Sequence, residues 1–179
     1  MRDVELRLIS ELMRNSRRSD RQLAKAIGTS QPTVSRLIKK LEKEGTIREY
    51  TIIPGYAELG FQIMALTFFR LRKDVPDAEM ARIRMMGTAM TQDSALEVVM
   101  TERGMGMESN VVAISFHKDY SAYKSFRGWI AQFDFIKVED IQSFLIDLSD
   151  NVRYRPLTFS TLAKHLMKSA ELEKNRRKA

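Results

Sequence analysis

The 179-residue sequence contains no cysteine, which excludes disulfide bridges and thiolate metal sites. It also lacks an apolar run long enough to cross a membrane. Acidic residues at positions 3 and 5 stand where a signal peptide would need an apolar segment, so we expect no secretion signal. These absences are compatible with a reducing compartment, and we expect a cytoplasmic protein.

The sequence likewise lacks the patterns of a catalytic or cofactor site. His117 and His165 lie in separate elements, and neither has a second ligand at metal-site spacing. The Gly104-x-Gly106 fragment follows no strand–helix pattern of a dinucleotide site, and no nucleophile–base pair is apparent. We therefore expect no enzyme, no metal and no cofactor, and we interpret both histidines as structural or surface residues.

The net charge of +7 is unevenly distributed along the chain. Residues 1–60 carry twelve Lys and Arg against eight Asp and Glu, and residues 150–179 carry eight against three. Residues 61–149 carry ten against twelve. Both ends are thus basic and the middle is slightly acidic, which predicts that a polyanion would bind the N-terminal part while the middle has another task.

Residues 19–45 contain two consecutive helix signals. In chain order these are a capping box (Ser19, Gln22), a helix-ending glycine (Gly28), a second cap with proline in the first turn (Ser30, Pro32) and a final glycine (Gly45). Apolar residues recur at helical spacing within both segments. Two short helices joined by about three residues that include a glycine form the helix-turn-helix pattern.

The outward face of the second helix favours DNA recognition. If its apolar residues face a core, one polar and basic set remains outside: Gln31, Thr33, Ser35, Arg36, Lys39, Lys40 and Lys43. Short hydrogen-bonding side chains in the first turns suit base edges, and the later cations suit phosphates. The alternative is a solvated, lysine-rich helix face. We favour DNA recognition, with Ser30 as the cap, because cap, turn, apolar stripe and polar face agree.

The remainder of residues 1–53 completes a winged helix-turn-helix domain. Residues 3–14 form an apolar-striped first helix, for which Asp3 is the expected cap. After Gly45, β-forming residues over 46–53 predict a short wing or strand, with Ile47 packed on the helices. A connector then spans residues 54–60.

Residues 61–149 predict a second, ferredoxin-like domain. The expected elements are strands over 61–71, 94–101, 110–117 and 137–148, a helix over 76–86, and a helix capped by Asp119 with Tyr123, Phe126, Ile130 and Phe133 on one face. This β-α-β-β-α-β order gives an antiparallel sheet with both helices on one side, and the whole chain an α+β fold. The strands are apolar on both faces, which predicts that a second copy covers the open face in a homodimer.

Residues 150–179 predict an amphipathic helix with a basic end. Leu162, Leu166 and Ala170 form its expected stripe. We prefer a docked helix with a solvated tip over a second DNA contact, because charge runs are common at chain termini.

The loop expected over residues 102–109 has the polar groups to hold a small molecule. The candidate effector-binding residues are Glu102, Arg103, Gly104, Glu108, Ser109 and Asn110. An ordinary solvated hairpin tip is the alternative.

The segments 3–15, 23–28 and 30–47, with the connector from Pro54 to Phe61, resemble the Lrp/AsnC family of transcription regulators. The resemblance implies an N-terminal domain that binds double-stranded DNA and a second domain that dimerises and senses a small molecule, often an amino acid. It further implies dimers that assemble into rings such as an octamer, and a nucleoid location. The loop at Gly104 departs from the family pattern, because a Gly is usually followed by an Asp where this chain has Glu108.

Two other functions remain open at this point. Some haem-pathway decarboxylases resemble this family in fold, which would make the chain an enzyme with a vestigial DNA-binding domain. An architectural DNA-binding protein without an effector is the other alternative.

Overall fold

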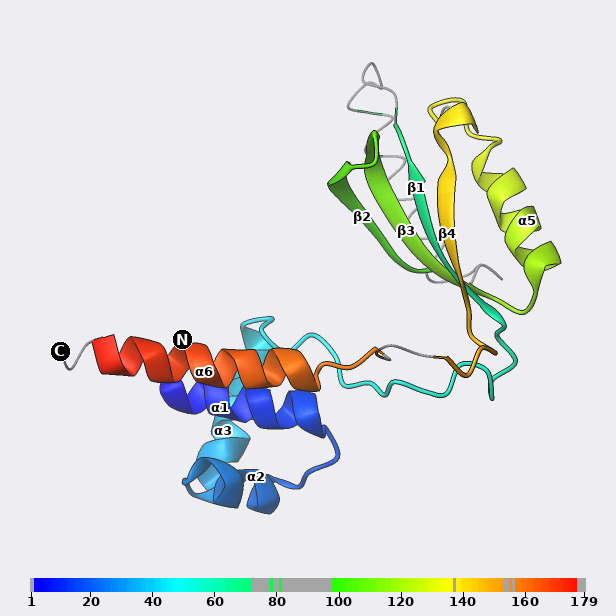
Figure 1. The fold of residues 1–179 in the computed structure, drawn as a ribbon. Coiled ribbons are helices and arrows are strands. Elements are labelled where there is room, and N and C mark those ends of the chain that lie inside the picture. Colours follow the sequence, from blue (N-terminus) through cyan, green and yellow to red (C-terminus); the bar gives the residue numbers. More distant parts are fainter. Residues whose placement is uncertain are drawn as a thin grey trace. The chain divides into compact units, whose positions relative to one another are not determined.

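The computed structural model describes residues 2–71, 78, 81, 98–136, 138–152, 155 and 157–176. The chain divides into two compact units, Met1–Ile53 with Tyr154–Ala179, and Pro54–Arg153. Each unit has its own apolar core. The two ends of the chain therefore belong to one unit, which nothing in the sequence had indicated (Figure 1).

The first unit is built from helices. They are α1 (Asp3–Arg14), α2 (Asp20–Ile27), α3 (Gln31–Lys43) and α6 (Ser160–Arg176). The first three pack around a core of Leu8, Leu23, Ala24, Ile27, Val34, Leu37 and Leu41. These are the apolar positions at helical spacing, so the predicted helix-turn-helix is confirmed.

The ends of α2 form as predicted. The Ser19 hydroxyl accepts a hydrogen bond from the Gln22 N–H at 3.3 Å, and the Gln22 side-chain oxygen accepts one from the Ser19 N–H at 2.9 Å. Gly28 has a φ of 73°, a left-handed conformation that is costly for residues with a Cβ. Gly45 also lies in this region, just after α3.

The C-terminal helix is docked, as expected. Its partner is α1, which the sequence did not indicate, and the contact is centred on a different stripe. Figure 1 shows α6 running alongside α1. Ala163 is fully buried, whereas Leu162 of the predicted stripe is 50% exposed. Leu166 is half-buried as predicted, and its neighbour Met167 is also half-buried. The contact is centred one residue away from the predicted stripe because a small residue lets the two helices approach closely.

Two predictions about the first unit were wrong. Asp3 is not a cap, because α1 begins at Asp3 and the Glu5 carboxylate accepts the Arg2 N–H at 2.8 Å instead. Residues 46–53 form no strand in the described structure. The N–H groups at 46 and 47 bond back to the Leu41 carbonyl, so the chain first closes α3 and then runs without a strand partner. Ile47 does pack on the helical core, as predicted.

The second unit contains a four-stranded antiparallel sheet in the order β2-β3-β1-β4. The strands are β1 (Ile63–Phe69), β2 (Val98–Gly106), β3 (Ser109–His117) and β4 (Gln142–Asp147). This strand order is that of the predicted ferredoxin-like fold. Of the helix predicted over residues 76–86, only residues 78 and 81 are among the described residues, so this prediction is not tested.

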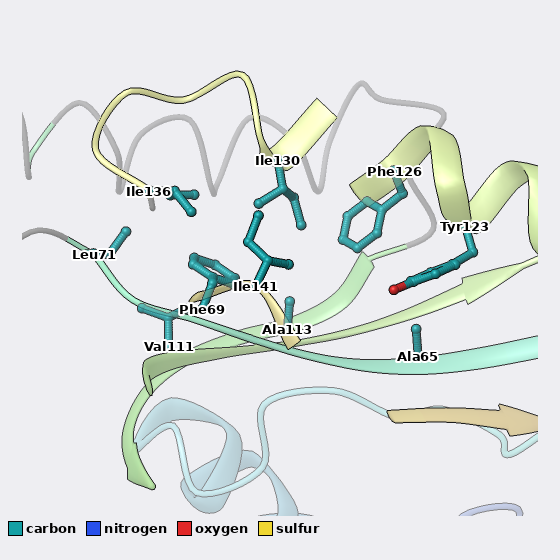
Figure 2. Close-up of a cluster of buried hydrophobic side chains, with 10 residues drawn as sticks. All are labelled: Ala65, Phe69, Leu71, Val111, Ala113, Tyr123, Phe126, Ile130, Ile136 and Ile141. Atoms are coloured by element: carbon teal, nitrogen blue, oxygen red, sulfur yellow. The ribbon is translucent and has the colours of Figure 1, made fainter. Parts of the chain in front are cut away.

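Helix α5 (Tyr120–Ile130) covers one face of this sheet (Figure 2). Its cap is the Asp119 carboxylate, which accepts the Ala122 N–H at 2.8 Å. Tyr123, Phe126 and Ile130 are buried as predicted, against a cluster formed by Ala65, Phe69, Leu71, Val111, Ala113, Ile136 and Ile141. Phe133, predicted on the same helix face, lies beyond the end of α5 and still packs against this cluster.

Several strand boundaries differ from the prediction. Strand β2 continues to Gly106, so the expected loop over 102–109 shrinks to a turn at Met107 and Glu108. The pairing of Gly106 with Ser109 extends the hairpin to this turn and supplies the reason. The strand predicted over 137–148 is a short 3₁₀ helix η1 (Val138–Asp140) followed by the shorter β4.

Candidate nucleic-acid interface

Helix α3 is held with its apolar side inward. Val34, Leu37 and Leu41 are buried, and Ile38 packs partly buried against the same core. The Ser30 hydroxyl accepts the Thr33 N–H at 3.4 Å and lies 2.8 Å from the Thr33 hydroxyl. Capping and core packing together fix which side of α3 faces solvent.

The predicted DNA-facing residues lie together along the outer side of α3. Ser30, Gln31, Arg36, Lys39 and Lys40 are exposed, and Thr33 and Ser35 are half-buried. The Arg36 Nε donates to the Pro32 carbonyl at 3.4 Å, which leans this cation over the first turn of the helix. The first turns thus offer short polar groups and the later turns offer cations, an arrangement suited to reading bases and holding phosphates.

Lys40 is engaged within the unit rather than free. Its Nζ lies 2.7 Å from Glu5 Oε1 on α1 and 3.5 Å from Glu44 Oε1. The Glu5 side chain is buried, and it also accepts from the Arg2 guanidinium. Lys40 therefore connects α3 to α1, a contact between distant positions that no local pattern in the sequence predicts.

This contact changes the titration of both groups. The hydrogen bond from Lys40, followed by that from the Arg2 N–H, lowers the pKa of Glu5 to about 2. The same hydrogen bond raises the pKa of Lys40. The sequence could have indicated that Glu5 is buried and paired. Position 5 falls within the apolar stripe of the first helix, and an acid buried there needs a partner.

A second contact joins α3 to the segment that follows it. The Tyr50 hydroxyl donates to Glu42 Oε1 at 3.0 Å. Partial loss of hydration at this half-exposed side chain, then the hydrogen bond to Glu42 and the negative charge of Glu42, raise the pKa of Tyr50 to about 12. Tyr50 therefore stays protonated and able to donate at neutral pH.

The candidate effector residues do not converge in a single chain. Glu102 and Arg103 are successive residues of β2, so their side chains point to opposite faces of the sheet. The Asn110 side chain accepts the Leu71 N–H at 2.8 Å and donates to the Leu71 carbonyl at 3.2 Å, which gives it a structural task.

The other three members lie on the hairpin itself. Gly104 is an exposed residue of β2, and Glu108 occupies the turn. The Glu108 carbonyl accepts from the Arg70 side chain, and the Ser109 hydroxyl donates to the Met107 carbonyl at 3.1 Å. These hydrogen bonds therefore stabilise the turn and connect it to Arg70.

His117 is a buried core residue. Its Nε2 lies 2.8 Å from the Ser115 hydroxyl, and its ring packs near Tyr123 and Phe126. Across the described ranges, no group of three His, Cys, Asp or Glu side chains is placed to hold a metal ion. Over the same residues, no helix is both long and apolar enough to span a membrane.

Comparison with known proteins agrees with this architecture. A family profile described as winged helix-turn-helix DNA-binding matches residues 1–48. An HTH-type transcriptional regulator of Pyrococcus abyssi is 30% identical over 151 residues, which cover 84% of this chain and 93% of that protein.

Solved structures share the fold over nearly the whole chain. An AsnC family transcriptional regulator from Agrobacterium tumefaciens superposes with a TM-score of 0.69 at 19% identity, covering 90% of this chain and 99% of that one. The transcriptional regulator NMB0573 from Neisseria meningitidis, in a complex with L-Met, gives a TM-score of 0.71 at 20% identity, covering 93% and 99%. The chain thus combines an N-terminal helix-turn-helix with an antiparallel sheet domain, and it shares the fold of the AsnC family structure. As the Pyrococcus abyssi relative shows, it belongs to the HTH-type transcriptional regulators.

Proposed function

We propose that the chain recognises specific double-stranded DNA sequences through the outer side of α3, acting as a homodimer. The observation that carries this proposal is the division of polar and basic side chains along a capped helix whose other side is locked in a core. Gln31, Thr33 and Ser35 approach base edges in the major groove. Arg36 and Lys39 bind phosphates.

Lys40 has a positioning task in this proposal. Its ammonium is shared with Glu5, so its charge is partly neutralised before any phosphate arrives. It fastens the recognition helix to α1 and adds less to phosphate binding than Lys39. For Lys39, the described residues provide no ion-pair partner.

The sheet domain supplies a surface for the dimer. On the side of the sheet opposite α5, the strand register aligns one apolar set, here called the open face: Met64, Leu66, Phe68, Met100, Val112, Ile114, Phe144 and Ile146. Phe144 is 64% exposed, and the others are half-buried or at the edge of exposure. We assign this face to a second copy, because two identical apolar faces bury each other in an isologous contact. We extend this proposal to the assembly of four such dimers into an octamer.

The experiment is DNA binding measured by fluorescence anisotropy over a range of salt concentrations, on genomic fragments recovered with the full-length protein. Lys39→Ala should weaken binding to all fragments and reduce the slope of log Kd against log salt by roughly one unit. Gln31→Ala should instead reduce the preference for the recovered motif, by about fivefold to a hundredfold.

Lys124→Ala provides the matched control, because it removes an exposed lysine from α5 in the other unit. Equal losses for Lys39→Ala and Lys124→Ala would refute the assignment of α3. Binding without any sequence preference would favour an architectural protein, and a haem absorbance on the purified protein would favour the decarboxylase alternative.

The proposed function also includes a small-molecule effector that changes DNA affinity. The related fold of NMB0573 was solved with L-Met, so L-methionine is the first ligand to test. In the single chain the candidate residues do not form one pocket, and a pocket would need the second copy against the open face, where Glu102 lies. Calorimetry with L-methionine and other amino acids, followed by anisotropy in their presence, decides whether any of them changes DNA affinity.

A further inference from the structure

The contact between α1 and α6 is built from small, fully buried residues. Ser10 of α1 is polar, yet its exposed fraction is 0%. Its hydroxyl donates to the Ala163 carbonyl of α6 at 3.0 Å, and Ala163 is also 0% exposed. A buried hydroxyl needs such a partner, and two small side chains let the helix backbones approach closely. The contact is therefore specific rather than a loose association of a terminal helix.

This contact lies on the side of α1 away from the helix-turn-helix core. Leu8 belongs to that core, and Ser10 is about 200° further around the helix. Leu6 and Met13 share the face of Ser10 at helical spacing, and both are half-buried. Helix α1 thus packs on two sides, which explains why its apolar stripe is wider than one face requires.

The opposite side of α1 holds the recognition helix. Leu8 packs in one core with Val34 and Leu37 of α3. Glu5 binds Lys40 of α3 at 2.7 Å. Helix α1 therefore lies between α6 on one side and α3 on the other.

We propose that α6 is a positioning element for DNA recognition: docked on α1 of its own chain, it fixes the helix that holds α3 in place. The inference rests on the proposed DNA-binding function and deepens it by adding Ser10 and Ala163 as positioning residues remote from the DNA. It also gives the DNA-binding unit two covalent connections to the sheet domain, one on each side of Pro54–Arg153.

A direct DNA contact by the basic side of α6 is the competing explanation. Lys164 and Lys168 are exposed, and they lie about 100° and about 140° around α6 from Ala163. The two explanations differ in salt dependence, because each lost phosphate contact lowers the slope of log Kd against log salt, whereas lost positioning leaves the slope unchanged.

The first test compares two full-length variants that carry the same new charge. Ala163→Glu puts a carboxylate into the buried contact, and Thr161→Glu puts one on the exposed, opposite side of α6. Ala163→Glu should weaken DNA binding roughly two- to thirtyfold with an unchanged salt slope, because it acts without touching DNA. It should also lower the melting temperature of the helical unit. Thr161→Glu should change neither quantity. Equal weakening by both variants, with a reduced salt slope, would overturn the proposal in favour of direct contact.

The second test keeps α6 docked and covers the case in which Ala163→Glu unfolds the unit. Because the chain has no cysteine, Ser10→Cys with Ala163→Cys introduces the only thiol pair, which copper-phenanthroline can oxidise. The oxidised protein should run as a monomer on a non-reducing gel. It should bind DNA within about twofold of the reduced protein, because α6 is already docked on α1 in the reduced protein. A disulfide-linked dimer, or a locked chain that loses DNA binding and regains it on reduction, would overturn the inference.

The outcomes separate this inference from the proposed function. If the wild-type chain and Thr161→Glu bind no DNA, the proposed function fails. If both bind DNA while Ala163→Glu binds equally well, only the inference fails.

Discussion

Glu5 is the residue on which three segments of the first unit meet. Its carboxylate accepts from the Arg2 N–H, from the Arg2 guanidinium and from Lys40 Nζ. A nearly buried carboxylate is stable only when its oxygens are paired in this way. The residue therefore caps α1 and connects it to the recognition helix at the same time.

The pKa of Glu5 predicts an acid-dependent stability. The pKa is about 2 in the folded protein, against 4.5 for an ordinary glutamate. Between these pH values the unfolded chain binds more protons, so the contribution of Glu5 is complete above about pH 4.5 and is lost as the pH falls towards 2.

Glu5→Gln should remove this dependence and lower the free energy of unfolding by about 1–2 kcal/mol at neutral pH, because a neutral amide holds Lys40 less strongly. Urea unfolding at several pH values measures both effects. Glu44→Gln is the control, since Glu44 is half exposed and lies 3.5 Å from Lys40; it should cost less than about 0.5 kcal/mol. A Glu5→Gln protein as stable as the wild type would show that the Glu5–Lys40 contact has no role in stability.

At the scale of elements, the β2–β3 hairpin contains an unfavourable turn. Met107 and Glu108 have φ values of 50° and 55°, and neither is a glycine. A two-residue hairpin turn with two positive φ angles favours Asn-Gly, because these residues adopt the left-handed region at little cost. Gly104 and Gly106, which were expected in a loop over residues 102–109, are strand residues instead.

Met107→Asn with Glu108→Gly should therefore stabilise the sheet domain by about 1 kcal/mol. Thermal unfolding of the full-length protein provides the measurement. Met105→Asn is the control, because this side chain is fully exposed within β2 and lies outside the two-residue turn. A double variant that is no more stable than the control would mean that the positive φ angles at Met107 and Glu108 do not lower the stability of the sheet domain.

At the scale of the whole molecule, we expect the open face of the sheet to determine the assembly. Its apolar residues come from all four strands, so they form one continuous surface only after the sheet has formed. The side covered by α5 is already a core (Figure 2). A second copy on the open face would present two α3 helices, and a DNA site for such a dimer would be a pseudo-palindrome with half-sites about one helical turn, or a multiple of it, apart.

Phe144→Glu should convert the dimer into monomers without unfolding the chain, because Phe144 is 64% exposed in the single chain. Sedimentation velocity measures the assembly and circular dichroism the fold. Tyr120→Glu, at an aromatic residue 61% exposed at the start of α5, should leave the assembly unchanged. A Phe144→Glu protein that remains dimeric would place the dimer contact elsewhere.

The sequence by itself determined the features that depend on near neighbours. The capping box at Ser19, the turn at Gly28 and the cap at Ser30 each involve residues only a few positions apart. The local sequence is therefore enough to predict them. The order of strands and helices followed from the period of the apolar residues, which gave the ferredoxin-like sheet and the exposed side of α3.

Only the tertiary structure decided the contacts between distant parts of the chain. Glu5 and Lys40 are 35 positions apart, and Ser10 and Ala163 are 153 positions apart. No local pattern specifies such pairs, because packing of whole elements brings them together. For that reason the sequence did not indicate that Lys40, which we expect near a phosphate, also pairs with Glu5 of α1. It also predicted a short wing or strand over residues 46–53, which form no strand in the described structure. Helix α3 and its exposed side could be identified from local residues, but the contact of α3 with α1, and that of α1 with α6, depend on both ends of the chain.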